Sequence, residues 1–223
     1  KFGQSVSTRQ DLLPEDIGLE LAKLQDQVPP FSGELALKAI EDAYGQPAGE
    51  VFAEFNPEAL AAASIAQVHV AKLHSGLEVI VKILRPNVQQ QVERDIEILY
   101  LIAGLAQRYW VDGRRLRPIE IVQEYEKTVL NELDLMREAA NAAQLRRNFI
   151  DSSMIYVPEI YWDYCRTQVM VMERIHGVPI SDMDSLRRAG TDCKNPAANG
   201  VEIFFPQVFR DNLFHADLHP GHI

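Results

Sequence analysis

The strongest hydrophobic patterns in the chain predict β-strands. Residues 65–73 and 78–84 are rich in β-branched and apolar side chains, and the intervening His74–Gly76 has the composition of a turn. We therefore expect a β-hairpin in this region. Two shorter segments, 157–160 and 168–172, predict further strands.

Helical periodicity fills most of the remaining chain. Ser32 has the side chain of a helix N-cap, Gly45 stands where a left-handed residue closes a helix, and Pro118 begins a helix that we expect to run unbroken to about Asn148. The predicted helices cover residues 14–28, 33–44, 88–110, 118–148, 181–189 and 197–211. Strands grouped early and helices late favour an α+β fold over a parallel βαβ sheet.

Composition narrows the classes of function. The 223 residues are 47% hydrophobic and 24% charged, as in an ordinary soluble protein, and the net charge of −10 argues against nucleic-acid binding. The two cysteines lack C-x-x-C spacing, and no apolar run reaches the length of a membrane span, about 18 residues. The sequence starts at Lys1 rather than Met and stops at Ile223, so we expect a chain clipped at both ends.

The segment Val79–Lys82 has the pattern of the protein-kinase strand whose lysine contacts nucleotide phosphates. An ammonium group acts there as a point charge on phosphate oxygens. A lysine at the end of an ordinary strand, with its ammonium in solvent, is the alternative, and for this segment alone it is the more common case.

The C-terminal residues add a second kinase-like pattern. His215, Asp217 and Leu218 match three of the four fixed letters in the catalytic-loop motif H-R-D-L, in which the Asp positions the proton of the nucleophile. The same residues, with His219 and His222, also offer imidazole and carboxylate ligands for a metal ion. We favour the kinase-like interpretation because a loop containing proline lacks the one-face spacing of a preformed metal site.

Acidic residues on the predicted long helix supply a partner for the lysine. In kinases a helix glutamate pairs with the strand lysine, and Glu138 lies 56 residues (138 − 82) after Lys82. The predicted helix 88–110 would be an insertion that explains this gap. Glu132 and Asp134 lie nearby, and the alternative is that all three acids form a solvated helix face.

Two further segments would surround a nucleotide. Glu173 and Ile175 follow the predicted strand 168–172, where kinases place the hinge that meets adenine, although a buried strand end would give the same pattern. The glycine-rich phosphate loop is absent, and its place is taken by Ala62, Ala63, Ser64, Ile65 and Ala66. Alanine reaches positive φ less readily than glycine, so we expect a stiff loop.

Four motifs together resemble the UbiB/ABC1/ADCK family of atypical kinase-like proteins, most closely its bacterial UbiB branch. They are the K-x-G-Q signature at Lys1–Gln4, the alanine-rich loop at Ala62–His69, the E-x-D helix at Glu132–Asn141 and the H-A-D-x-H-P-G loop at His215–Gly221. The resemblance covers essentially the whole chain.

The resemblance implies a kinase-like, bilobal α+β fold that binds ATP with Mg²⁺ or Mn²⁺ and supports ubiquinone biosynthesis as an ATPase. Lys82 would pair with Glu138, and Asp217 would be the catalytic-loop aspartate. The residues of the K-x-G-Q and E-x-D motifs would occupy the pocket where a protein substrate docks; they are Lys1, Gln4, Glu132 and Asp134.

The resemblance also implies a domain plan and partners. We expect a helical extension over 1–56, a kinase-like N-lobe over 57–175 with helix 88–110 inserted, and a partial C-lobe over 176–223. The implied partners are adenine nucleotide, phenolic polyprenyl precursors and proteins of quinone biosynthesis. In the full-length protein we expect a cytoplasmic location, peripheral to or anchored at the bacterial inner membrane.

Two departures from the family pattern affect these expectations. His222 stands where the family has a metal-binding Asn, and imidazole is a poor ligand for Mg²⁺. A sequence error and a loss-of-function substitution would both explain it. The family's D-F-G-like metal ligand lies beyond Ile223, so we expect this chain to bind nucleotide weakly without turnover.

Two other functions remain open at this point. One is a non-catalytic module that binds nucleotide or lipid. The other is a metal-dependent hydrolase that uses His215, Asp217, His219 and His222.

Overall fold

The computed structural model describes residues 29–110, 113–152 and 155–178, together with Arg188, Ile203 and Phe205. It separates into two compact units, which we describe individually. One contains the described residues up to Glu138 together with Tyr161–Val171, and the other contains Ala139–Ile160 together with the described residues from Met172 onward.

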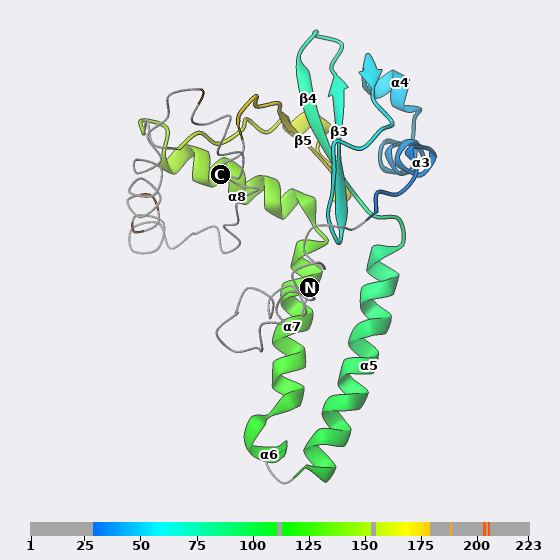
Figure 1. The fold of residues 1–223 in the computed structure, drawn as a ribbon, viewed down its shortest axis with the longest axis vertical. Coiled ribbons are helices and arrows are strands. Elements are labelled where there is room, and N and C mark those ends of the chain that lie inside the picture. The colour runs from blue at the N-terminus through cyan, green and yellow to red at the C-terminus, as the bar shows by residue number, and fades with distance from the viewer. Residues whose placement is uncertain are drawn as a thin grey trace. The chain divides into compact units, whose positions relative to one another are not determined.

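A twisted sheet forms the centre of the first unit (Figure 1). Its strands are β1 (Glu54–Phe55), β2 (Ala61–Ala62), β3 (Ala66–Lys72), β4 (Glu78–Leu84) and β5 (Val169–Glu173), of which β5 ends in the second unit. The order is β1-β3-β4-β5, with β2 also paired to β3. The predicted hairpin is confirmed as antiparallel β3 and β4, joined at Gly76, which has a φ of +90°.

Buried and partly exposed side chains alternate at the end of β4, so one face of the strand belongs to the core and the other carries Lys82. Val79, Val81 and Ile83 have no exposed surface and belong to the hydrophobic core, which also includes Val169 of β5. Each such side chain contributes roughly 1.5–3 kcal/mol by burial. Because successive side chains of a strand point to opposite faces, Lys82 lies on the other face of the sheet.

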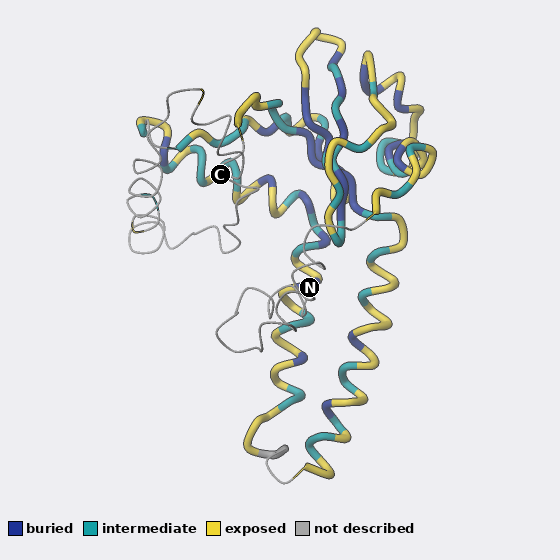
Figure 2. The backbone as a smooth tube through the Cα atoms, in the orientation of Figure 1, coloured by how far each residue is buried: buried dark blue, intermediate teal, exposed yellow. Residues whose placement is uncertain are grey.

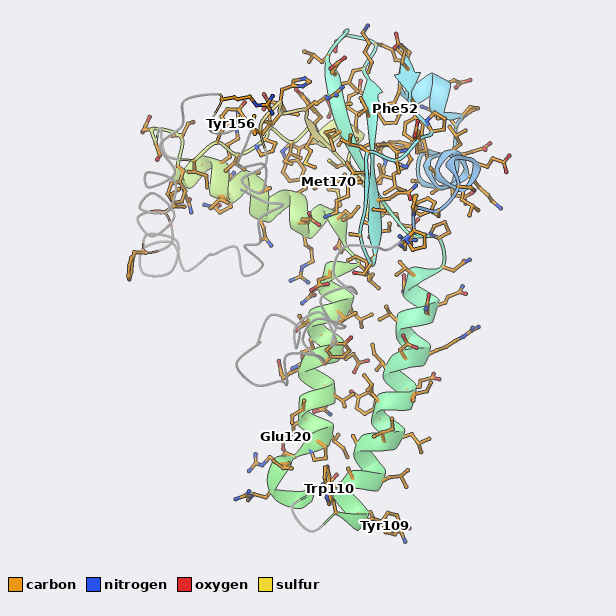
Figure 3. The ribbon with its side chains drawn as sticks, viewed as in Figure 1. Phe52, Tyr109, Trp110, Glu120, Tyr156 and Met170 are labelled. Carbon is orange, nitrogen blue, oxygen red and sulfur yellow. The ribbon has the colours of Figure 1, made fainter. Side chains whose placement is uncertain are left out.

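Helix α3 (Gly33–Tyr44) packs against the core side of the sheet and is followed by the short helix α4 (Ala48–Val51). The Ser32 hydroxyl accepts a hydrogen bond from Leu35 N–H, and Gly45 closes α3 with a φ of +70°. Both caps are therefore confirmed. Phe52, which is labelled in Figure 3, is fully buried in the same core.

A helical hairpin extends from the sheet within the first unit. It consists of α5 (Val88–Tyr109), the short α6 (Gly113–Leu116) and α7 (Pro118–Glu132), with α5 and α7 side by side (Figure 1). The predicted helix 88–110 is confirmed as α5. Figure 2 shows that most positions of α5 and α7 are exposed or half-buried. We call α5, α6 and α7 the helical arm.

The predicted unbroken helix from Pro118 to Asn148 is wrong. The structure has two helices, α7 and α8 (Leu135–Asn148), separated at Leu133 and Asp134. Asp134 Oδ1 accepts a hydrogen bond from Met136 N–H at 3.0 Å, so Asp134 is the N-cap of α8. Hydrophobic periodicity continues through the break, which is why the pattern hides it.

The predicted strand 157–160 is also wrong. This segment forms only an isolated bridge between Ile160 and Met172 and a short 3-10 helix follows at Trp162–Tyr164. The predicted strand 168–172 corresponds to β5. The predicted helix 14–28 lies outside the described residues, as do most positions of the helices predicted at 181–189 and 197–211.

Candidate functional site

Lys82 and Glu138 form an ion pair in the first unit. The Lys82 ammonium nitrogen lies 2.6 Å from Glu138 Oε1. The side chains keep 23% and 44% of their surface exposed, so solvent screens the pair, which adds at most about 1 kcal/mol to stability. The pair directs the ammonium group of β4 toward the first turn of α8, which contains Glu138.

The start of α8 fixes the position of Glu138. Leu135 N–H donates a hydrogen bond to Thr167 O at 2.9 Å, and the Leu135 side chain is fully buried. The Asp134 cap sets the first turn, which contains Glu138. The helix start is therefore attached both to the turn that precedes β5 and to the core, and these contacts position the first turn of α8 that carries Glu138.

The alanine segment forms a closed turn at the edge of the same sheet. Ala61 and Ala62 pair with β3, and Ala63 N–H donates to Ala66 O at 2.8 Å. Ser64 and Ile65 form the tip of this turn. Among the described residues, the non-glycine positions with positive φ are Asn87 and Arg117, so the alanines need no left-handed conformation.

Arg85, just past the end of β4, holds this turn in place. Its backbone N–H donates to Ile65 O at 2.8 Å, and its Nε donates to Ala63 O at 3.0 Å. Its Nη2 donates to Pro29 O at 2.9 Å, and the guanidinium lies 5.7 Å from the centre of the Phe31 ring. One side chain therefore connects the alanine turn to the segment that leads into α3.

A buried polar pair lies directly after the alanine turn. Gln67 and His69, both on β3, have no exposed surface, and their Nε2 atoms are 2.8 Å apart. His69 Nδ1 is 2.9 Å from Asn56 O, which can only accept, so Nδ1 carries the proton and Nε2 accepts from Gln67. Gln67 also exchanges two hydrogen bonds with the backbone of Phe31.

Burial sets the charge of His69. Desolvation lowers the pKa of His69, and the hydrogen bond to Asn56 O opposes this only in part. The ring is therefore neutral near pH 7. A protonated ring would direct a second N–H toward the Gln67 amide nitrogen and break the network. Burial likewise lowers the pKa of the Arg85 guanidinium, which stays charged.

In the second unit, Glu173 belongs to a local network. Its carboxylate accepts hydrogen bonds from the Tyr156 hydroxyl at 2.6 Å and from Glu159 N–H at 3.1 Å, and it lies 3.7 Å from the Arg146 guanidinium. These contacts, the Tyr156 hydroxyl first, lower the pKa of Glu173. Its backbone N–H donates to Glu159 O at 2.8 Å. The Ile175 side chain is exposed.

Comparison with known proteins identifies the family. The family model described as the ABC1 atypical kinase-like domain matches residues 23–223. The chain belongs to this family. It is 58% identical over its whole length to "Probable protein kinase UbiB" of Pseudomonas aeruginosa strain PAO1, of which it covers 42%. It is 55% identical to the protein of the same name from Marinobacter nauticus and covers 41% of it.

A solved structure supports the same assignment. The structure of Rv3197 from Mycobacterium tuberculosis in complex with erythromycin matches 99% of this chain and 55% of its own, with a TM-score of 0.69 and 28% identity. The kinase-like α+β fold of the ABC1 family is thus confirmed. The chain spans about two fifths of the length of the curated relatives named above.

Within the ABC1-family fold, the predicted site residues fall into three groups. Lys82 and Glu138 meet in one ion pair, and the alanine turn lies on the same sheet. Glu132 ends α7, and Asp134 caps α8. Glu173 and Ile175 belong to the second unit. There the Glu173 carboxylate accepts a hydrogen bond from Glu159 N–H, and the Glu173 N–H donates to Glu159 O. Lys1, Gln4, His215, Asp217, His219 and His222 lie outside the described residues.

The described residues contain neither a cluster of metal ligands nor a helix that could span a membrane. Within 29–110, 113–152 and 155–178, no group of three or more His, Cys, Asp or Glu side chains is arranged to hold a metal ion. None of the described helices is both long and apolar enough to cross a bilayer. Asp217 and His222 lie outside these ranges, so the roles predicted for them stay predictions.

Sequence reasoning missed Arg85, Gln67 and His69. The signal for the pair was present, because two polar residues two positions apart share one face of a strand whose neighbours are apolar. Arg85 gave no such signal, since a basic residue before a proline is common at the end of a strand.

Proposed function

We propose that this chain contributes the nucleotide-binding part of an atypical kinase-like ATPase that supports ubiquinone biosynthesis. The observation that carries the proposal is the 2.6 Å ion pair between Lys82 and Glu138. Protein kinases use such a pair to align the strand lysine with the α- and β-phosphates of ATP. The alternative is that Glu138 is simply an exposed acid on a solvated helix face. That alternative does not require Glu138 to contact a lysine on the strand.

The chemistry of the site suits a phosphate group. The Lys82 ammonium keeps donors beyond the one directed at Glu138, because an ammonium group has three. Ala62, Ala63, Ser64, Ile65 and Ala66 form a turn that would lie over the phosphates, held by Arg85. Mg²⁺ would neutralise phosphate charge; Asp217 would be the catalytic-loop aspartate, and His222 stands where the family has its metal-binding Asn, although imidazole is a poor ligand for Mg²⁺.

The biological role rests on the relatives. Their name, "Probable protein kinase UbiB", supports a role in ubiquinone biosynthesis for the longer protein. Phenolic polyprenyl precursors, proteins of the same pathway and a membrane surface are the partners we propose for it. Turnover requires parts of the longer protein that the described residues do not include.

The test is nucleotide-dependent thermal stabilisation of wild type and Lys82→Ala, with ATP, with ATP and Mg²⁺, and with Zn²⁺ alone. Lys72→Ala is the matched control, because Lys72 lies on the neighbouring strand and pairs with Glu54 at 3.7 Å. A charge-assisted contact contributes about 1.5–3 kcal/mol, so we expect K82A to weaken ATP binding about ten- to a hundredfold. Equal stabilisation of K82A and wild type would contradict the proposal.

A second candidate is a non-catalytic module that binds nucleotide or lipid. The Arg85 contacts favour it, since a turn fixed by hydrogen bonds to Ala63 O and Ile65 O closes less freely over phosphates than a glycine loop. ATP hydrolysis by the full-length protein, stimulated by a phenolic precursor, would decide for the ATPase. Binding without hydrolysis would decide for the module, and stabilisation by Zn²⁺ alone would favour the metal-dependent hydrolase.

A further inference from the structure

A side chain of β3 binds the segment that precedes α3. This segment, Pro29–Phe31, which we call the entry segment, leads to the cap of α3 at Ser32. The Gln67 amide accepts a hydrogen bond from Phe31 N–H at 3.0 Å and donates one to Phe31 O at 3.3 Å. One side chain therefore satisfies both backbone groups of Phe31, as a residue of a neighbouring strand would.

Gln67 is itself held by contacts that use the oxygen and both N–H groups of its amide. Besides its two bonds with Phe31, its Nε2 lies 2.8 Å from His69 Nε2, and His69 is bonded in turn to Asn56 O. Burying polar side chains in an apolar sheet costs free energy unless they are hydrogen-bonded. Here the bonds offset that cost and attach two segments outside β3, one at Phe31 and one at Asn56, to the sheet.

The Gln67 side chain lies on the face of the sheet away from Lys82. Across the strands, Gln67 pairs with Ala62 on β2 and with Ile83 on β4. Lys82 pairs instead with Val68. Because neighbouring residues of a strand point to opposite faces, Gln67 shares the core face with Ile83. Any effect of Gln67 on a phosphate beside Lys82 must therefore pass through other residues.

Arg85 joins the entry segment to the alanine turn. Its Nε donates to Ala63 O, and its Nη2 donates to Pro29 O. Both nitrogens belong to one planar guanidinium, so the directions of the two bonds are fixed relative to each other. The same group lies 5.7 Å from the centre of the Phe31 ring. A displacement of the entry segment therefore disturbs the bond that holds Ala63 O, and a displacement of the turn disturbs the entry segment.

We propose that Gln67 is a positioning residue for the nucleotide site and acts on the alanine turn through Phe31 and Arg85. This inference rests on the proposed function, in which the turn lies over the phosphates of ATP. A phosphate that orders the turn also orders the Arg85 guanidinium, and this restricts opening of the entry segment. Linkage makes the effect reciprocal, so an entry segment released from Gln67 lowers the affinity for ATP.

The alternative is a purely structural role for Gln67. In that case, removing its bonds to Phe31 would lower the free energy of unfolding, and the ATP affinity of the folded protein would not change. Hydrogen exchange with and without ATP, together with the ATP affinity of variants, distinguishes the two roles.

The first measurement needs no substitution. Phe31 has the sole backbone N–H of the entry segment, since Pro29 and Pro30 have none, and this N–H donates to Gln67. Hydrogen exchange of the Phe31 amide would be followed in the full-length protein with and without saturating ATP and Mg²⁺. We expect ATP to slow this exchange about five- to tenfold, in the lower part of the range for coupled sites.

The second measurement is the ATP affinity of Gln67→Met, which keeps a side chain of similar length and removes both bonds to Phe31. Reciprocity limits its effect to the factor found for exchange, so we expect binding to weaken by up to about five- to tenfold. Val51→Ala is the matched control, because Val51 is buried in the same core on α4. V51A should lower the free energy of unfolding and leave ATP affinity within about twofold of wild type.

Two milder variants keep the test open if Q67M does not fold. Phe31→Leu and Phe31→Tyr both keep the backbone bonds to Gln67 and differ in the aromatic ring. Since the Arg85 guanidinium lies against that ring, Phe31→Tyr should retain more of the ATP effect on exchange than Phe31→Leu.

The outcomes separate this inference from the proposed function. If ATP slows exchange of the Ala63 amide but leaves the Phe31 amide unchanged or faster, the inference is overturned and the proposed function stands. Equal ATP affinity of Q67M and V51A would also overturn it, because Gln67 would then have a structural role alone. If ATP affects neither thermal stability nor the Ala63 amide, the proposed function fails and the inference fails with it.

Discussion

Replacing Arg85 with alanine should release the alanine turn. The change removes the hydrogen bonds from its guanidinium to Ala63 O and Pro29 O, and the contact with the Phe31 ring. Bonds from a charged donor contribute about 1.5–3 kcal/mol each, and partial exposure lowers this, so we assign about 2 kcal/mol to the two together. The ring contact adds about 0.5–1 kcal/mol.

The resulting loss of about 2.5–3 kcal/mol should appear locally. Hydrogen exchange reports the opening of single segments, and the amides to follow are those of Ala63, which donates to Ala66 O, and of residue 85, which donates to Ile65 O. We expect exchange about 70- to 160-fold faster in R85A than in wild type. Arg85→Lys should be intermediate, since an ammonium group cannot span both carbonyls in the fork geometry.

The control for R85A is Arg147→Ala, because Arg147 is an exposed arginine of α8 that bonds Gln144. It should leave exchange at residues 61–66 unchanged. Exchange of the Ala63 amide in R85A within twofold of wild type would refute the argument that Arg85 holds the turn.

The other predictions concern His69, Asp134 and Tyr156. The pKa of His69 is lowered in the folded state, so below about pH 6.5 the unfolded chain binds more protons than the folded chain. The free energy of unfolding, measured with urea, should therefore fall as the pH is lowered through this range. His69→Asn should reduce this pH dependence, and His74→Gln should not. Removing the cap with Asp134→Ala should lower stability by about 1 kcal/mol, measured the same way, whereas Asp134→Ser should restore most of it. Tyr156→Phe should raise the pKa of Glu173 in an NMR titration of the carboxyl carbon, and an unchanged value would contradict the assigned cause.

Local signals explain which parts of the fold could be predicted. The caps of α3 at Ser32 and Gly45 and the turn at Gly76 depend on residues within a few positions, and each was predicted correctly. The break before α8 was missed, because apolar residues keep helical spacing through Leu133 and only the Asp134 cap marks the new helix. Side chains that can cap a helix are also common inside helices, so the sequence alone did not identify Asp134 as a cap.

The candidate site was harder to predict because its contacts join distant residues. The pairing of Lys82 with Glu138 spans 56 residues and was expected from the family resemblance rather than from periodicity. Arg85 also reaches back 56 residues to Pro29. No residue pattern specifies the backbone carbonyl that an arginine will contact, and this is the physical reason that the arginine was missed.

The direct test of the central claim is a double-mutant cycle on ATP affinity with Lys82→Ala, Glu138→Ala and both together, measured by calorimetry with Mg²⁺. Glu138 should act through Lys82, since the two side chains meet at 2.6 Å. We predict that each single variant weakens ATP binding and that the double variant binds no more weakly than K82A. Unchanged affinity in both single variants, or effects that simply add, would contradict the account.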